Sequence, residues 1–301
     1  MSTRRILAAA FVAVVAGAAL ATCGGSPPAS PTPGGGGGGG VGTTPNTPPV
    51  VKSITAADSR VEVGSPVTLT ATVEDAETPI ADLTYAWTAD TGTFAGTGAQ
   101  VTWTPGADAK TPGDFVLTLT VTERYTTLSG PAENKATGTI SVHVNNSPKE
   151  LADLSLRFLG DFANSKISPE ACVSQFSDAT SKCAAGKRDE LDDVRVNRHD
   201  YEMIASTLRH SGLTIAPDRL GATVHTFCSF TVKVISPDPI DEPCLNGKCP
   251  LGSQGTSTGD CWTTNVYEQG RWWLCESHFT PLPALTQPGT FAPTIFRHRG
   301  L

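Results

Sequence analysis

The strongest chemical signal in the sequence is a group of seven cysteines in its second half. Zinc sites favour cysteine pairs two to four residues apart, together with histidine or further cysteine. Only Cys244 and Cys249, with four residues between them, come near that spacing. Disulfides are the expected chemistry of such cysteines in an exported chain, so we predict disulfides and no metal site. The seven are Cys172, Cys183, Cys228, Cys244, Cys249, Cys261 and Cys275.

The local sequence predicts two of the disulfides. Cys244 and Cys249 flank Asn246-Gly247, a dipeptide that suits a two-residue hairpin turn of type I′. The two cysteines then form a non-hydrogen-bonded pair, whose Cα atoms lie about 4.5 Å apart, within the range of a disulfide. Cys172 and Cys183 enclose a short loop between two expected helices and form the second predicted pair.

The third predicted disulfide, Cys261 with Cys275, depends on the register of an expected hairpin. A three-residue loop centred on Glu268 places the two cysteines opposite each other. A bulged loop ending at Gly270 leaves them diagonal, about 7 Å apart. We predict the opposed register and the disulfide. Cys228 then remains a buried free thiol on the apolar face of a neighbouring strand.

The histidine motifs of metal and catalytic sites are missing from the sequence, which holds no His-Glu-x-x-His and no His-x-His. We therefore assign no catalytic residue and no cofactor. If the chain is an enzyme, His225, Tyr201 and Asp200 are its candidate side chains. An acidic run at residues 74–77 offers oxygen ligands for Ca²⁺, but no Asp-x-Asp-x-Asp spacing supplies the rest, so we interpret it as a solvated loop.

The composition of the chain and its distribution along the sequence indicate which segments fold and could position these side chains. The formal net charge is −7 and the pI about 5.4, which excludes the basic footprint of a nucleic-acid-binding protein. Ten of the 30 glycines and six of the 23 prolines lie in residues 24–48. Such a segment cannot bury enough apolar area to fold, so we predict a disordered tether with a span of about 25–30 Å.

The N-terminus predicts export and a lipid anchor. Arg4 and Arg5 precede an apolar stretch from Ile6 to Leu20, as in a secretory signal peptide. Leu20-Ala21-Thr22-Cys23 then resembles the bacterial lipobox, which implies cleavage before Cys23 and acylation of that cysteine. Because Gly24, and not Asp, follows the cysteine, we expect the outer membrane or the cell surface. The alternative is an ordinary signal peptide cut near Ala21.

Residues 49–146 alternate apolar and polar side chains, for example along Val67–Val73 and Phe115–Val121, which is typical of half-buried strands. Seven short strands without a helix predict an antiparallel β-sandwich. The segment resembles bacterial Ig-like and polycystic kidney disease-type (PKD) extracellular repeats, on the evidence of Val63–Leu69, Tyr85-Ala86-Trp87 and Gly113–Thr122. In such a domain we expect Trp87 in the core, not in a sugar-binding platform.

Residues 147–280 combine helices with a sheet of long strands and hold all seven cysteines. Ser147-Pro148-Lys149-Glu150 predicts a capping box at the start of a helix with Leu151, Leu154 and Phe158 at helical spacing. A second helix is expected from Ser168 and a third over 187–197. Strands follow at 222–234, 260–267 and 271–279, which gives an α+β layout. Residues 281–301 are expected to be a disordered tail.

This order resembles the nuclear-transport-factor-2-like superfamily, on the evidence of Phe158-Leu159, Phe162 and the hairpin Val266–Leu274 with its Gly-x-Trp. The resemblance implies a cone of curved antiparallel sheet packed around helices. Some members are isomerases or dehydratases, while many exported members only bind. No catalytic residue of a member matches a position in this chain.

The sequence thus predicts a multidomain envelope protein, an all-β Ig-like sandwich followed by an α+β domain. We expect a membrane contact through the lipid anchor, no nucleic acid, and a non-catalytic partner that is a protein, a glycan or a small molecule. The alternatives are an enzyme with its pocket in the cone and a purely structural protein. The predicted segments are a signal peptide (1–22), Cys23 with the tether (23–48), the sandwich (49–146), the disulfide-rich domain (147–280) and the tail (281–301).

Overall fold

The computed structural model describes residues 46–178, 183, 186–237 and 250–282. The lipidation candidate Cys23, the cysteines Cys244 and Cys249, and most of the tether and the tail lie outside these residues. No helix among the described residues is long and apolar enough to cross a membrane.

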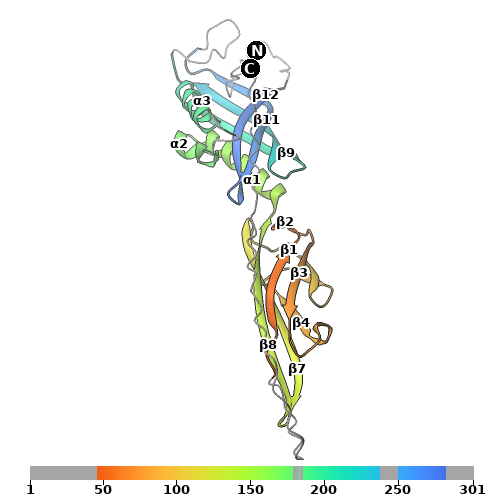
Figure 1. Ribbon diagram of the computed structural model, residues 1–301. Coiled ribbons are helices and arrows are strands. Elements are labelled where there is room, and N and C mark those ends of the chain that lie inside the picture. Colours follow the sequence, from red (N-terminus) through yellow and green to blue (C-terminus); the bar gives the residue numbers. More distant parts are fainter. Residues whose placement is uncertain (1–45, 179–182, 184–185, 238–249, 283–301) are drawn as a thin grey trace, which may run out of the picture. The chain divides into compact units, whose positions relative to one another are not determined.

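The first half of the described chain forms two four-stranded sheets (Figure 1). One has the order β1-β3-β6-β5, and the other has the order β2-β8-β7-β4, with β2 parallel and the remaining pairs antiparallel. A short 3-10 helix, Ile80–Asp82, precedes β4. The strands are β1 (Val50–Ala56), β2 (Arg60–Glu62), β3 (Val67–Glu74), β4 (Thr84–Thr88), β5 (Thr93–Ala95), β6 (Gln100–Thr104), β7 (Gly113–Thr127) and β8 (Gly130–Asn145).

The alternating residues of these strands build the core between the two sheets. In β3, every second residue from Val67 is buried, and in β7 the series Leu117, Leu119 and Val121 is fully buried. Trp103 is also fully buried. Trp87 packs against the same core, so the expectation that it serves packing is confirmed.

The hairpin of β7 and β8 is longer than the sheet around it. β4 pairs with β7 only over Thr118–Thr122, whereas β7 and β8 stay paired until Thr127 meets Gly130. We call the extension, residues 123–134, the ribbon. Its base holds Glu123, a fully buried carboxylate.

The second half is an α+β domain with a four-stranded antiparallel sheet of order β12-β11-β10-β9. The predicted alternation of buried and more exposed residues along the strand at 222–234 is confirmed. The predicted helices are also present. The helical elements are α1 (Ser147–Ala163), α2 (Pro169–Cys172), the 3-10 helix η2 (Val173–Gln175) and α3 (Gly186–Asp200). The strands are β9 (Tyr201–Ile215), β10 (Gly221–Val234), β11 (Gln254–Glu268) and β12 (Arg271–Pro281).

The start of α1 differs by one residue from the prediction. Asn146, not Ser147, is the N-cap, and its side chain accepts a hydrogen bond from the backbone N–H of Lys149. The Glu150 carboxylate in turn accepts the N–H of Asn146 at 2.7 Å. Ser147 is the first helical residue because its backbone N–H and hydroxyl both donate to Glu62.

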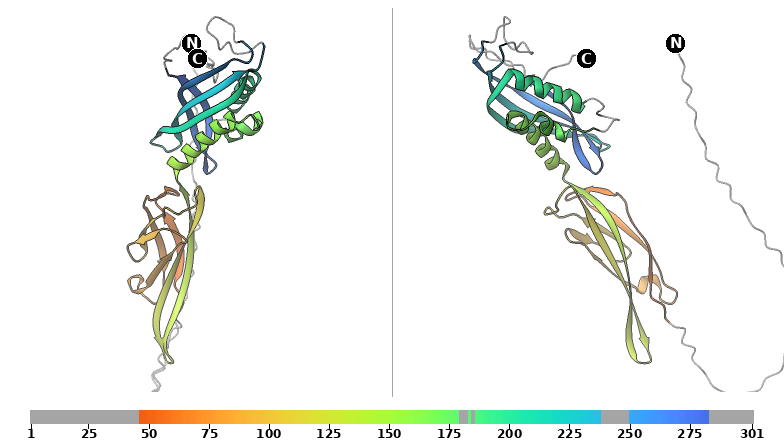
Figure 2. Two further views of the ribbon diagram at one scale, coloured as in Figure 1. Left: turned by 180° about the vertical axis from the view of Figure 1, so that it is seen from behind. Right: turned by 90° about the vertical axis from the view of Figure 1, so that its left-hand side faces the viewer.

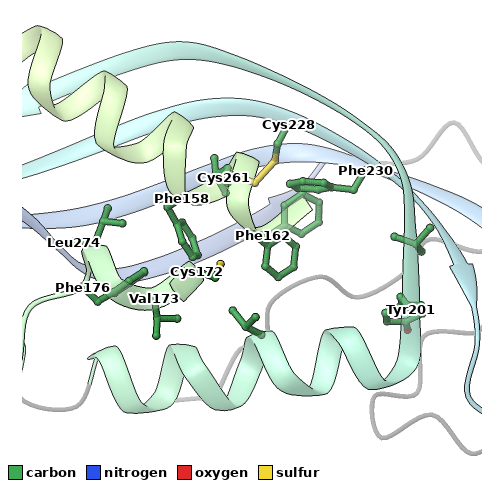
Figure 3. Close-up of a cluster of buried hydrophobic side chains, with 14 of the residues drawn as sticks. Phe158, Phe162, Cys172, Val173, Phe176, Tyr201, Cys228, Phe230, Cys261 and Leu274 are labelled. Carbon is green, nitrogen blue, oxygen red and sulfur yellow. A yellow bond between two sulfur atoms is a disulfide. The ribbon is translucent and has the colours of Figure 1, made fainter. Parts of the chain in front are cut away.

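All three helices of this domain lie on one face of its sheet, as two views in Figure 2 show. α1 contacts β9, β10 and β12, and α3 contacts β12 and β9. The strands curve around the helices, so the cone-like α+β layout is confirmed. The core between them holds the aromatic rings of Phe158, Phe162, Phe176 and Phe230 (Figure 3).

Arg60 of β2 joins the sandwich to the α+β domain. Its guanidinium donates to Asn145 Oδ1 at 3.0 Å and to the carbonyl of Arg219 at 2.7 Å. The same group lies 3.3 Å from the centroid of the Tyr267 ring. Arg219 donates back to the carbonyl of Arg60 at 3.2 Å and to Asp58 at 2.5 Å. The two domains therefore share a polar contact and not only a peptide linker.

Candidate functional site

The space between the helices and the sheet of the α+β domain is filled by side chains. Phe176 meets Phe158 edge-on with ring centroids 4.9 Å apart, and Phe230 meets Phe162 at 5.7 Å. Beside Phe162, the domain retains a cavity of about 20 Å³ next to Tyr201. A single water needs about 10–15 Å³ on this measure, so this cavity has room for no substrate.

The three side chains named as enzyme candidates do not converge. Asp200 is fully buried at the end of α3 and pairs with His199 at 2.7 Å. Tyr201 is buried beside the small cavity. His225 alternates with the buried residues of β10 and so projects from the other face of the sheet. The predicted enzyme site is therefore not assembled by these residues.

The face of the sheet opposite the helices carries the richest set of functional groups in the described chain. We call it the outer face. Strand register aligns Gly212, His225, Trp262 and His278 in one row across all four strands. The next row contains Arg209, Phe227, Asp260 and Thr280. These residues share a face because each row is an even number of positions from the next along β10 and β11.

Side chains on the outer face already hold one another in place. The Trp262 and His278 rings are stacked, with centroids 3.9 Å apart and planes 19° apart. His225 Nδ1 lies 2.7 Å from Asp260 Oδ2, and Arg209 lies 5.7 Å from the ring of Phe227. The stacked His278 ring covers one face of the Trp262 indole. The arrangement suits a surface contact that combines aromatic rings with hydrogen bonds.

Next to these rows the outer face is lined with hydroxyl groups. Ser229 and Thr258 share a hydrogen bond of 2.9 Å, and so do Thr231 and Thr256. Hydroxyl groups both donate and accept, so these rows can complement many polar partners. The outer face could not be predicted from the sequence, because its residues come from four strands whose register the sequence does not reveal.

Within the described residues, no cluster of histidine, cysteine and carboxylate side chains has the geometry of a metal site. The carboxylates of Glu74 and Asp75, in the acidic run at residues 74–77, already bond to neighbouring groups of the protein. Asp75 Oδ1 accepts the backbone N–H groups of Glu77 and Thr78, at 3.0 and 2.7 Å, and Glu74 pairs with Lys52 at 2.8 Å. These contacts agree with the expected solvated loop.

Two carboxyl groups are buried for different reasons. Glu190 of α3 accepts the hydroxyl of Ser277 at 2.6 Å, and burial raises the pKa of Glu190 to about 8 despite that hydrogen bond. Burial would also raise the pKa of Glu123, but hydrogen bonds from Thr78, Asn46 and Asn134 outweigh it and hold that pKa below its ordinary value. Its raised pKa favours the protonated, neutral form of Glu190, whereas the lowered pKa of Glu123 favours the ionised carboxylate.

The structure corrects the predicted disulfides within the described residues. Cys183 pairs with Cys275, with Cα atoms 5.0 Å apart, and Cys228 pairs with Cys261, at 6.0 Å. The predicted pairs Cys172–Cys183 and Cys261–Cys275 were therefore wrong, as was the free thiol at Cys228. Cys172 is the free cysteine, and burial raises the pKa of its thiol to about 12.

Strand register explains the correction. Cys261 lies opposite Phe279, because β11 and β12 shift register between Thr264 and Asn265. Cys275 falls at that irregularity, four residues from Phe279, and so is out of reach of Cys261. Cys228 lies opposite Gly259, one diagonal step from Cys261, and their Cα distance is within the disulfide range.

No protein-family model matches the chain, and no curated protein matches it in sequence. Three solved structures resemble parts of it. A conserved protein from Planctomyces limnophilus DSM 3776 is 14% identical, with a TM-score of 0.32, over 45% of this chain and 98% of its own. A type 2 hexachlorocyclohexane dehydrochlorinase (LinA) is 14% identical, TM-score 0.32, over 48% and 95%. The intermembrane-space region of the chloroplast protein ARC6 is 11% identical, TM-score 0.30, over 45% and 95%.

Proposed function

We propose that this chain is a lipid-anchored protein of the bacterial envelope, at the outer membrane or cell surface, that binds a partner without chemical turnover. Cys23 carries the lipid, and the Gly- and Pro-rich tether leads to the sandwich. The sandwich is an Ig-like or PKD-type spacer, supported by its two four-stranded sheets, in which every pair except β2–β8 is antiparallel. The α+β domain, which resembles the nuclear-transport-factor-2-like superfamily, carries the binding surface.

The contrast between the two faces of the C-terminal sheet carries this proposal. The helix-covered face is packed with aromatic side chains, and a pocket of useful size is missing from the core that these residues form. The outer face presents imidazole, indole, carboxylate and guanidinium groups without a covering helix among the described residues. A ligand therefore finds its chemical partners on the outside of the cone.

The test compares two outer-face variants with a matched control. His225→Ala and Trp262→Ala each remove one member of the central row. His210→Ala removes an imidazole from the same sheet, but His210 lies in register with the buried Thr226 and so belongs to the other face. The full chain is probed with a glycan panel, a metabolite mixture and an extract of the native envelope.

We expect His225→Ala and Trp262→Ala to lose the bound component that wild type and His210→Ala retain. A component that all four chains bind equally would contradict the outer face as the binding surface. Chemical conversion of a bound metabolite by the wild type would instead establish the enzyme alternative.

A further inference from the structure

Beyond its base at Glu123 and Asn134, the ribbon contributes no residue to the core clusters of the described sandwich. Beyond Thr122 it pairs with no third strand, and an isolated two-stranded hairpin is only marginally stable in water. The sandwich therefore gains little stability from these residues. The ribbon does, however, extend beyond the rest of the sheet, so its tip can contact a surface outside the domain.

The tip of the ribbon carries an apolar side chain where turns usually carry a polar residue. Thr127 and Gly130 are the last paired residues, which leaves Leu128 and Ser129 as a two-residue loop. Glycine, asparagine, aspartate and serine dominate such positions. Leu128 is instead fully exposed, at 101% of its reference area, and none of the core clusters of the sandwich includes it.

The base of the ribbon is the place where the tether enters the folded domain. Asn46, the first described residue, donates to Glu123 at 3.0 Å, and Asn134 from the opposite strand donates to the same carboxylate at 3.0 Å. Thr47 donates to Glu77 at 2.7 Å. The buried charge of Glu123 thus fixes the end of the tether beside the ribbon.

The span expected of the predicted tether is larger than the reach of the ribbon. Between Cys23 and Asn46 the chain has 22 residues, and a Gly-rich chain of that length would span about 25 Å on average. From Glu123 to Leu128 the ribbon rises about 16 Å at roughly 3.3 Å per residue. The tip can therefore reach the surface in which Cys23 is anchored without extending the tether.

We propose that Leu128 inserts into the lipid surface that holds the Cys23 anchor. This inference rests on the proposed lipid anchor. The contact is apolar, because Arg124 is paired with Glu133 at 3.3 Å and the ribbon has no net positive charge. The ring of Tyr125, three residues from the tip, is suited to the headgroup layer, since tyrosine has an apolar body and a polar end. One covalent and one inserted attachment together restrict how the folded domains rotate about the tether.

The experiment uses the full chain, purified with its native N-terminus and reconstituted in phosphatidylcholine vesicles whose acyl chains are brominated. Leu128→Trp places a fluorescent probe at the tip. Val116→Trp, on strand β7 that leads to the tip, replaces another exposed apolar residue, 58% exposed, far from the tip. We expect the emission added by Leu128→Trp to shift to the blue and to be quenched by bromine, at low and high salt alike. The emission added by Val116→Trp should do neither.

The mass of the N-terminal peptide separates the two hypotheses. If Cys23 carries no acyl chains, the lipid anchor is wrong and the insertion falls with it. If Cys23 is acylated and Leu128→Trp is not quenched, the insertion alone is wrong. Equal quenching of Val116→Trp, or a blue shift only after addition of envelope protein, would also overturn a lipid contact specific to the tip.

Discussion

At the scale of single residues, Glu190 should make the stability of the α+β domain depend on pH. Its pKa is about 8 in the folded chain, against an ordinary value of 4.5. Between these values the folded state binds one more proton than the unfolded state, so stability falls as pH rises through that window. The full shift corresponds to a loss on the order of 5 kcal/mol. Glu190→Gln should remove this loss, as measured by urea unfolding from pH 5 to pH 9.

The matched control for Glu190 is Asp192→Asn, on the same helix but with its side chain 50% exposed. It should leave the pH dependence of the wild type in place. Asp193 and Glu276 both raise the pKa of Glu190 further, so neither is a neutral control. Parallel stability curves for wild type and Glu190→Gln across the whole range would show that Glu190 titrates normally.

The cysteines show how far residue types alone can predict a site. Their number and the export signal predicted disulfides, and two pairs are present among the described residues. The pairing was wrong because it depends on which residues face each other across β11 and β12, and one irregularity beside Asn265 displaces Cys275. The face on which His225 lies, by contrast, depends only on the alternation within one strand: His225 lies on the face opposite Cys228.

At the scale of elements, the N-cap of α1 is a test of local sequence chemistry. Asn146→Ala removes the side-chain oxygen that accepts the N–H of Lys149. Loss of such a cap typically costs about 1 kcal/mol, and we expect a decrease of that size in the free energy of unfolding. Urea titration followed by circular dichroism measures it.

The control for the cap is Asn146→Asp, which keeps an accepting oxygen at the helix N-terminus, where negative charge is favourable. Its stability should match or exceed that of the wild type. A loss as large as that of Asn146→Ala would mean that Asn146 contributes through another contact and not as a cap.

Most elements could be predicted because each repeats its own period. The alternation of β3 and β10 and the helical spacing of α1 are written in consecutive residues. The ribbon was not foreseen, because its residues alternate like the rest of β7 and only the short length of β4 leaves them unsupported. The outer face escaped prediction for a related reason, since it needs the register of four strands at once.

At the scale of the whole molecule, the order of the domains was readable from composition, but the contact between them was not. Arg60 lies early in the sandwich, and its partners Asn145, Arg219 and Tyr267 follow at 85 or more residues' distance along the chain. No periodicity links such positions. A lone arginine in a short strand gave no sign that it would become the centre of a polar junction.

This junction predicts that the sandwich and the α+β domain unfold together. Arg60→Ala removes one donor each from Asn145, Ser147 and the carbonyl of Arg219 and the cation over Tyr267. Asn145 and Ser147 keep donors from Tyr267 and Trp272, so each lost hydrogen bond costs about 0.5–1.5 kcal/mol. We expect the single thermal transition of the wild type to separate into two in Arg60→Ala, measured by calorimetry. Arg188→Ala, whose side chain is 77% exposed on α3, should keep one transition. Two transitions already present in the wild type would show that the domains are independent and that Arg60 does not couple them.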